Sequence, residues 1–276
     1  MRNMKKSQAP RAGDQGPRTN DQNVKTIALI SPHLDDAVFS VGGLMAVLAD
    51  AGHQLHLITC FTRSVPQPTG FALACQLDKG LSAEADYMQL RREEDRRACE
   101  LLGAQSHWLD LPEAPHRGYE SAAALFQDTL KADGIQPELT QRIRQACQTI
   151  RPDLILSPVG IGNHVDHQQV KRAVRSVCAD FPDAHFLQWY DEPYLARHPE
   201  LLPKKATTEL ALNWRVLVRH ATLPDDHVLS LDITSYVDRK IAACAAYTTQ
   251  IGFQFGGTDQ IRPALAKSGQ FTELIV

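Results

Sequence analysis

The feature that most constrains the fold is a strand–helix–strand unit close to the N-terminus. Residues 26–30 form the uninterrupted β-branched and aliphatic run TIALI, which is typical of a strand covered on both faces. Residues 37–52 then carry apolar side chains at helical spacing up to a stop at Gly52, and residues 53–61 form a second apolar run. This order predicts a parallel sheet with a right-handed crossover.

The rest of the chain continues the alternation. Further strands are predicted at 106–111, 154–158 and 185–190, and helices at 84–102, 138–150 and 164–180. Residues 62–83 contain proline and glycine without periodicity, so we expect a long loop that serves as a lid or rim. After residue 213, strand and helix patterns are mixed.

The predicted fold class is α/β, with a Rossmann-like, mostly parallel sheet flanked by helices. At 276 residues the chain is long enough for one large domain, and no linker divides it. We therefore predict a single domain over residues 24–276. Residues 1–23 are polar and rich in charge, glycine and proline, which predicts a disordered tail.

Composition argues against several classes of protein. The net charge of -3 gives no basic surface for a phosphate backbone, so no nucleic-acid partner is expected. No apolar run approaches the ~20 residues that span a bilayer. The first residues lack the apolar stretch of a signal peptide, and the six cysteines are scattered, so we expect a cytoplasmic protein with reduced thiols. A monomer and a homo-oligomer both remain open.

Polar residues with metal-binding chemistry follow the first predicted strand. His33, Asp35 and Asp36 lie at the edge of the sheet where ligands bind in open α/β folds. An imidazole and a carboxylate on one turn can hold a borderline metal such as zinc, while the second carboxylate takes a proton from water. The alternative is that Asp35 or Asp36 only caps the following helix.

A second cluster, His164, Asp166 and His167, follows the predicted strand at 154–158. Alone, it could be the solvated start of a helix. Two strand-to-helix junctions that present histidine and aspartate at one sheet edge instead predict a metal site. His33, Asp36 and one histidine of this cluster would be ligands, the other histidine would assist proton transfer, and Asp166 could orient a histidine.

The segments SPHLDDAVFSVGG and HVDHQQV resemble the LmbE-like, or PIG-L-type, zinc-dependent N-deacetylases. The similarity extends through weaker signatures: Arg91, Glu94 and Leu102-Gly103 on one helix, YDEPY at 190–194 and AYTTQ at 246–250. The resemblance implies that His33, Asp36 and His167 hold Zn²⁺, that Asp35 is the general base and that His164 is the acid or oxyanion partner. It also implies that the substrate is an N-acetylated amino sugar or a metabolite that contains one: a glycolipid, a sugar-linked thiol precursor or an antibiotic intermediate.

The substrate-binding residues are less constrained. The resemblance suggests Arg91, although an exposed helix charge is an equal alternative, and Asp110 is placed at a sugar-binding rim together with His116, Arg117 and Tyr119. Many relatives have glutamate where this chain has Ala37, so altered packing or rim chemistry is expected there.

Three rival functions remain at this point. A zinc hydrolase could act on a thiol-conjugate amide, a non-sugar amide or an ester, and a non-catalytic binding module could keep the same fold. Zinc and iron are both open as the native metal. A dinucleotide-binding protein is disfavoured, because the first turn lacks G-x-G-x-x-G and two adjacent carboxylates would repel a pyrophosphate.

Overall fold

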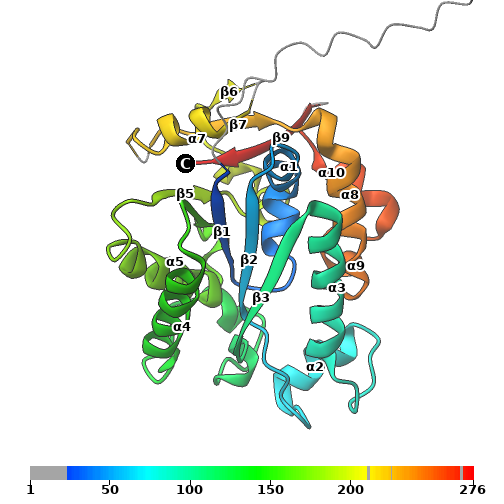
Figure 1. The fold of residues 1–276 in the computed structure, drawn as a ribbon. Helices are drawn as coiled ribbons and strands as arrows, with labels where there is room; N and C mark the ends of the chain where they lie inside the picture. The colour runs from blue at the N-terminus through cyan, green and yellow to red at the C-terminus, as the bar shows by residue number, and fades with distance from the viewer. Residues whose placement is uncertain (1–23, 210–211, 225, 268–269) are drawn as a thin grey trace, which may run out of the picture.

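A parallel sheet forms the centre of the molecule (Figure 1). The computed structural model describes residues 24–209, 212–224, 226–267 and 270–276, so the tail predicted at residues 1–23 lies outside the described residues. Five parallel strands have the order β3-β2-β1-β4-β5. Their bounds are Thr26–Ser31 for β1, Gln54–Phe61 for β2, Ala104–Leu111 for β3, Leu154–Pro158 for β4 and His185–Trp189 for β5.

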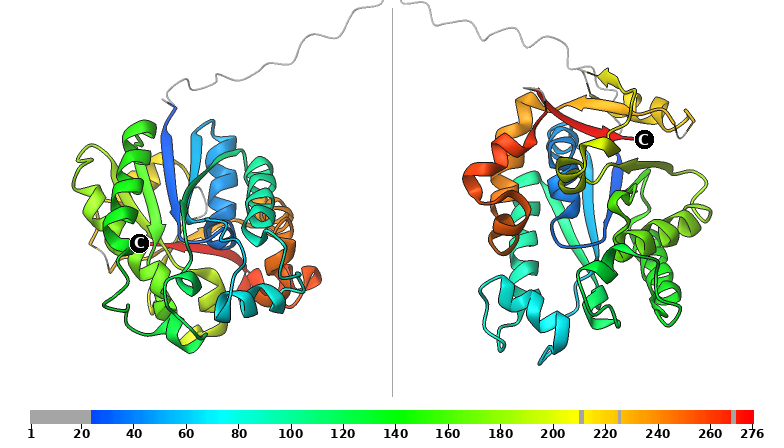
Figure 2. Two further views of the ribbon diagram at one scale, coloured as in Figure 1. Left: turned by 90° about the horizontal axis from the view of Figure 1, so that it is seen from below. Right: turned by 180° about the vertical axis from the view of Figure 1, so that it is seen from behind.

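The sheet continues beyond β5 with strands from the end of the chain. β9 (Gln270–Ile275) pairs antiparallel with both β5 and β7 (Leu229–Asp232), and β6 (Thr207–Glu209) pairs parallel with β7. A two-residue strand, β8 (Ala266–Lys267), pairs only with β9. Figure 2 shows β9 and β7 crossing the end of the sheet near the chain's entry to β1.

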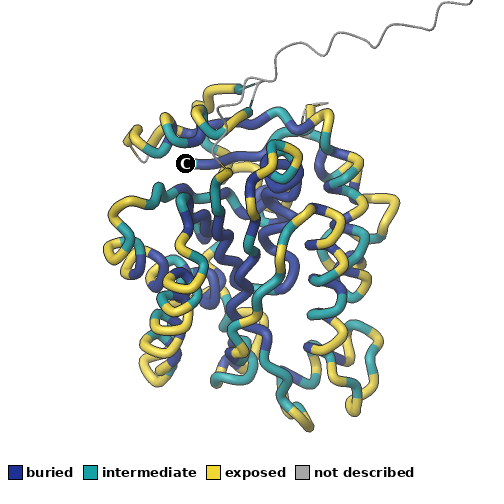
Figure 3. Tube along the Cα trace, in the orientation of Figure 1, coloured by how far each residue is buried: buried dark blue, intermediate teal, exposed yellow. Residues whose placement is uncertain are grey.

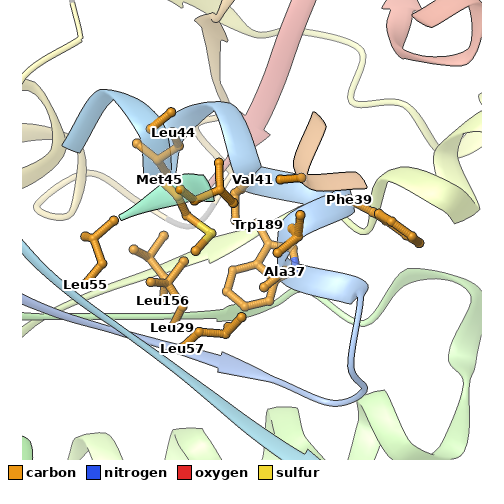
Figure 4. Packing of buried hydrophobic residues seen from close by; sticks show 14 of the residues in the cluster. Leu29, Ala37, Phe39, Val41, Leu44, Met45, Leu55, Leu57, Leu156 and Trp189 are labelled. Atoms are coloured by element: carbon orange, nitrogen blue, oxygen red, sulfur yellow. The ribbon is translucent and has the colours of Figure 1, made fainter. Parts of the chain in front are cut away.

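Helices cover both faces of the parallel strands. On one face, α1 (Asp36–Asp50), α3 (Tyr87–Leu102) and α8 (Val237–Ala245) enclose a core that includes Leu29, Leu57 and Trp189, the last two visible beneath α1 in Figure 4. On the other face, α4 (Ile135–Ile150) and α5 (Val165–Cys178) pack on Ala28, Ile30 and Ile58. The central strands are accordingly buried along their length (Figure 3), which explains their uninterrupted apolar sequences.

The remaining helices are short and lie in the connections between the strands and near the C-terminus. The α-helices are α2 (Gly70–Asp78), α6 (Glu192–Arg197), α7 (Trp214–His220), α9 (Thr248–Phe255) and α10 (Ile261–Leu265). Short 3₁₀ segments occur at Ala114–His116, Ala123–Phe126, Ile161–Asn163, Pro199–Leu201, Thr234–Tyr236 and Thr258–Gln260. Within the described residues, no helix has the length and apolar character needed to cross a membrane.

A kink divides α1, which the sequence had predicted as a regular helix. Val41 leaves helical geometry, and the backbone N–H groups of Gly43 and Leu44 each donate to the carboxylate of Glu273 on β9 at 2.7 Å. Lys240 on α8 donates to the same carboxylate at 2.7 Å. A Cβ atom at Gly43 would lie 2.7 Å from the side chain of Ile233, so only glycine fits this contact.

The predicted fold class is confirmed: the described chain is a single α/β domain with a mostly parallel sheet between helices. The first strand–helix–strand unit and the later strands occur where they were expected. Some expectations differ in detail. The segment 62–83 is not entirely loop, because residues 70–78 form α2. The helix expected over 84–102 begins at Tyr87, and the helix expected from about Glu138 begins at Ile135. The short, weakly amphipathic α2 gives little periodic signal in the sequence.

Candidate active site

The two histidine–aspartate clusters meet at the carboxyl end of the sheet. His33 lies between β1 and α1, Asp36 is the first residue of α1, and His167 lies in the first turn of α5 after β4. Because β1 and β4 are neighbouring parallel strands, both turns emerge at the same edge. The left view of Figure 2 looks onto this end of the molecule.

Three of these side chains could share one metal ion. His33 Nδ1 lies 3.1 Å from Asp36 Oδ2, and His167 Nε2 lies 3.2 Å from the same oxygen. The ligand atoms of the three residues all lie within 4.8 Å of one another. Two imidazoles and one carboxylate are a donor set that suits zinc and other borderline divalent metals.

The electrostatics of this cluster favour a cation. His167 Nε2 is buried and has no hydrogen-bond partner among the described residues, although it points toward Asp36. Burial alone would lower the pKa of His167, but Asp36 and Asp191 raise it to about 10. For the acid Asp36 the effects are reversed: burial alone would raise its pKa, but His167 and His33 hold it well below its usual range. The donor set and the unpaired nitrogen therefore fit a divalent metal.

The carboxylate of Asp166 contacts protein groups on both of its oxygens and so positions the residues around it. Its Oδ2 lies 2.9 Å from His33 Nε2 and accepts the backbone N–H of Ala114 at 3.1 Å, while its Oδ1 accepts from Arg117 at 2.7 Å. The contact to His33 Nε2 leaves Nδ1 of that ring facing Asp36. Asp166 thus has the orienting role that carboxylates have behind ligand histidines.

Arg117 and Tyr119 were expected at a sugar-binding rim, and that expectation was wrong. The Arg117 side chain is buried and joins Asp166 to Asp133, and the Tyr119 hydroxyl donates to Asp133 at 3.0 Å. Both residues therefore support the site from behind. His116 is half-buried beside them and does not line the cavity that contains His33.

Asp191 is a positioning residue that sequence reasoning missed. Its Oδ1 lies 2.7 Å from His167 Nδ1, and its Oδ2 accepts the backbone N–H groups of Gly160 and Ile161 at 2.9 and 3.2 Å. It therefore fixes both the ring of His167 and the turn that precedes the second cluster. The signal was present in the YDEPY segment, which carries this aspartate.

Asp35 is a buried carboxylate beside the three ligand candidates. Only 4% of its surface is exposed, and its side chain makes no capping hydrogen bond to α1, so the helix-cap alternative is wrong for this residue. Burial, reinforced by the charge of Asp36, raises the pKa of Asp35 to about 7 despite the opposing effect of Arg91. A carboxylate with a pKa near neutrality is suited to general base catalysis.

Arg91 is 4% exposed, so the alternative of a solvated helix charge is wrong. Its guanidinium pairs with Glu113 at 2.5 Å and lies 3.7 Å from Asp35 Oδ2. It lines the same cavity as Asp35. Arg91 can therefore orient the carboxylate of Asp35 or contact a substrate.

His164 combines a structural and a chemical role. Its Nδ1 accepts the backbone N–H of Asp166 at 3.2 Å and caps α5, while the ring is only 7% exposed and its centroid lies 5.0 Å from that of His33. Burial and the nearby His33 lower the pKa of His164 to about 3. A neutral ring with an accepting Nδ1 carries its proton on Nε2, where it can donate to a substrate oxygen.

A cavity of about 440 Å³ opens over these residues. His33, Asp35, Asp36, His164, Asp166 and Arg91 line its inner part, and Phe71 from α2 and Phe126 from the 110–135 segment line its walls. Asp110 was expected in this site, but it does not line the cavity. Its carboxylate is 68% exposed and lies 3.5 Å from Arg63.

Gly162 allows a tyrosine to approach the site closely. Its φ of +81° is in the left-handed region, and a Cβ atom there would lie 2.7 Å from the ring of Tyr194. That ring lines the cavity and lies 5.5 Å from the ring of His167. The glycine after β4 therefore makes room for an aromatic wall next to a ligand candidate.

The weaker sequence signatures also have structural explanations. Glu94 accepts from the hydroxyl groups of Thr248 and Thr249, at 2.6 and 2.8 Å, and so fixes the start of α9 next to the cavity. Ala37, in the first turn of α1, is buried in the core and does not line the cavity, so the departure at this position concerns packing.

The family model described as PIG-L, GlcNAc-PI de-N-acetylase, matches residues 28–178, which contain both clusters. This chain belongs to the PIG-L family. The resemblance inferred from the two histidine–aspartate segments is thereby confirmed. The family model and the deacetylase relatives together indicate that the chain is a hydrolytic N-deacetylase.

Curated relatives support the assignment. The chain is 30% identical over 224 residues to the 2'-N-acetylparomamine deacetylase of Streptomyces fradiae, covering 80% of this chain and 72% of the relative. It is 28% identical over 257 residues to the 1D-myo-inositol 2-acetamido-2-deoxy-alpha-D-glucopyranoside deacetylase of Segniliparus rotundus, covering 84% and 79%. The solved A40926 pseudoaglycone deacetylase shares the fold, with a TM-score of 0.71, 24% identity and coverage of 92% and 98%.

Proposed function

We propose that this PIG-L family member is a zinc-dependent enzyme that removes an N-acetyl group from an amino-sugar unit of a small conjugate. The observation that carries the proposal is the convergence of His33, Asp36 and His167 beside the buried carboxylate of Asp35. The named relatives in this family act on N-acetylated sugar compounds, which supports the substrate class.

The residues divide the chemistry among them. A zinc ion held by His33, Asp36 and His167 would polarise the amide carbonyl and lower the pKa of water. Asp35 accepts the proton of the attacking water, for which a pKa of about 7 is well matched at neutral pH. His164 donates its Nε2 hydrogen to the developing oxyanion as a neutral imidazole.

Asp35 and Arg91 then complete the reaction. Once protonated, Asp35 can return the proton to the departing amine nitrogen, which releases acetate and the free amino sugar. Arg91, 3.7 Å from Asp35, restrains the carboxylate in the cavity throughout this exchange.

The test is amine release from a panel of N-acetylated glycosides, aminocyclitol conjugates and sugar-linked thiol precursors. We expect hydrolysis that a chelator abolishes and that zinc restores. Titrating zinc and ferrous iron into the chelated protein identifies the native metal. Zinc-loaded protein that hydrolyses none of the sugars but cleaves non-sugar amides or esters would favour the rival hydrolase, and protein that cleaves nothing would favour a binding module.

A further inference from the structure

Two cations that line the cavity have no role in the chemistry above. Lys79 directly follows α2, Arg197 ends α6, and both line the same cavity as Asp35. Their charged groups lie over the ring of Phe253 on α9, at 4.0 and 5.2 Å from its centroid. Segments distant in the sequence therefore bring two positive charges to one aromatic ring.

Lys79 lacks an acceptor for its hydrogen-bond donors. Its side chain is only 13% exposed, and its ammonium group makes no hydrogen bond in the part of the chain that the structure describes. The carboxylate paired with it, Asp78, lies 3.7 Å away and is 72% exposed, so water screens this pair. The three donors of this ammonium are therefore not taken up by the described chain, and an anionic ligand in the cavity can accept them.

Arg197 is held in place by neutral groups. Its Nη2 donates to Gln254 Oε1 at 2.6 Å and to the backbone oxygen of Phe253 at 3.3 Å. Among the described residues, no carboxylate is paired with it, and its Nε and Nη1 groups have no hydrogen-bond acceptor. The guanidinium of this exposed residue is thus held at the cavity by neutral groups, and no protein carboxylate competes with a ligand for it.

The charged residues that line the cavity therefore form two groups, and among the described residues Asp78 is the one carboxylate beside the cationic group. Asp35, Asp36 and Asp166 gather at the metal site, whereas Lys79 and Arg197 gather around Phe253. We propose that the substrate carries an anionic oxygen group, a carboxylate or a phosphate, which Lys79 and Arg197 hold while the acetamide lies at Asp35. This inference rests on the proposed deacetylase function, and it implies that a cationic aminocyclitol unit is disfavoured.

The first experiment compares matched substrates that differ in charge. The probes are methyl N-acetylglucosaminide, its 6-phosphate, the corresponding uronate, and a glycoside with a 2-aminoethyl aglycone. We expect kcat/KM to be at least about tenfold higher for one of the two anions than for the neutral glycoside, and lowest for the cation. The phosphate and uronate arms distinguish the two sources of charge. A neutral glycoside that equals or exceeds both anions overturns the proposal.

Variants then assign the preference to Lys79. In Lys79→Met, the ratio of kcat/KM for the anion to that for the neutral glycoside should fall about tenfold, mainly through KM, and Lys79→Glu should shift the preference toward the cationic glycoside. Lys205→Met, which removes an exposed lysine that does not line the cavity, is the matched control and should keep the ratio. A fall of equal size for neutral and anionic substrates contradicts the proposal.

A binding measurement separates this inference from the deacetylase assignment. Calorimetry on the full chain compares glucosamine 6-phosphate with glucosamine, without any turnover. Tighter binding of the phosphate that is lost in Lys79→Met supports the anion site even if the hydrolysis panel fails. Hydrolysis of the neutral glycoside with no charge preference in binding or in turnover leaves the deacetylase standing and removes the anion site.

Discussion

Asp191 holds Nδ1 of His167 and so determines how Nε2 of that ring faces the proposed metal site. One carboxylate oxygen lies 2.7 Å from Nδ1 of the ring, and the other accepts two backbone N–H groups of the turn after β4. The charge of Asp191 also contributes to the raised pKa of His167. A change at this residue should therefore act on metal affinity and on the turn together.

Asp191→Asn should weaken metal binding by about 10- to 100-fold, because it removes the negative charge behind His167 and places an amide against the N–H groups of Gly160 and Ile161. Competition with a chromophoric chelator measures the affinity. His167→Ala should lose more affinity than Asp191→Asn. Equal zinc affinity in Asp191→Asn and the parent protein would show that Asp191 has no positioning role.

Asp35→Asn should retain the metal and lose most of the activity, by about a hundredfold or more, because the amide cannot accept the proton of water. Metal analysis and kcat on one substrate give the two readouts. Asp110→Asn is a matched control, since that carboxylate is exposed and outside the cavity, and it should stay within about twofold. Loss of metal with retained turnover in Asp35→Asn would reverse the assigned roles.

At the scale of elements, a buried ion pair joins α1, α8 and β9. Lys240 and Glu273 are 1% and 0% exposed, and Glu273 also accepts the two N–H groups that the kink at Val41 leaves without helical partners. This carboxylate therefore acts as a cap in the interior of α1. The pair ties the C-terminal strand to the helix that begins at the active site.

Lys240→Met should lower the free energy of unfolding by about 3–5 kcal/mol, because it leaves the Glu273 carboxylate buried with no counter-charge. Denaturant unfolding measures the change. Arg262→Met, in a pair that is 51% and 85% exposed, is the control and should cost less than about 1 kcal/mol. The double variant Lys240→Met with Glu273→Gln should recover part of the loss. A single variant as stable as the control would contradict the structural role of the pair.

Asp95 on α3 links this helix to β3 and to the start of α9. It accepts from Trp108 Nε1 at 2.9 Å and from the Tyr247 hydroxyl at 2.8 Å, and burial raises its pKa to about 6 despite these hydrogen bonds. A raised pKa means that the folded state binds the proton more tightly than the unfolded state does. The contribution of Asp95 to stability is therefore greatest below about pH 4 and declines until about pH 6.

Asp95→Asn should remove this pH dependence. Between pH 4 and pH 6, the unfolding free energy of the parent should fall by roughly 3 kcal/mol relative to that of the variant. The variant is therefore relatively more stable at the higher pH. Above about pH 6 the difference between the two should be constant. Urea unfolding at several pH values gives the comparison, and a difference that does not change with pH would show that Asp95 has an ordinary pKa.

At the scale of the whole molecule, the proposed metal site joins two parts of the chain that meet only in the folded state. His33 and Asp36 follow β1, whereas His167 follows β4. A ligand that binds only the folded state stabilises it by mass action. Metal binding and global stability should therefore be coupled.

Zinc at about a hundred times its dissociation constant should stabilise the protein by about 2.7 kcal/mol, and a chelator should reverse the effect. The midpoint of denaturant unfolding, with and without zinc, measures it. His167→Ala should unfold at the same midpoint in both conditions. A shift that persists in this variant would place the stabilising metal elsewhere on the chain.

The sequence by itself determined the parallel α/β core and the location of both histidine–aspartate clusters. Strand-length apolar runs such as residues 26–30 can only be buried on both faces, and the turns after such strands must emerge at one edge. These are local properties of the chain, so they could be inferred before the structure was known.

Only the tertiary structure decided which side chains serve those clusters. Asp191 and Arg117 contact the site across long sequence separations, the exposed position of Asp110 depends on the path of the chain after β3, and the kink in α1 depends on Glu273 from the last strand. Periodicity and residue type carry no information about such distant contacts. Their positions follow from how the strands and helices pack, which no local segment specifies.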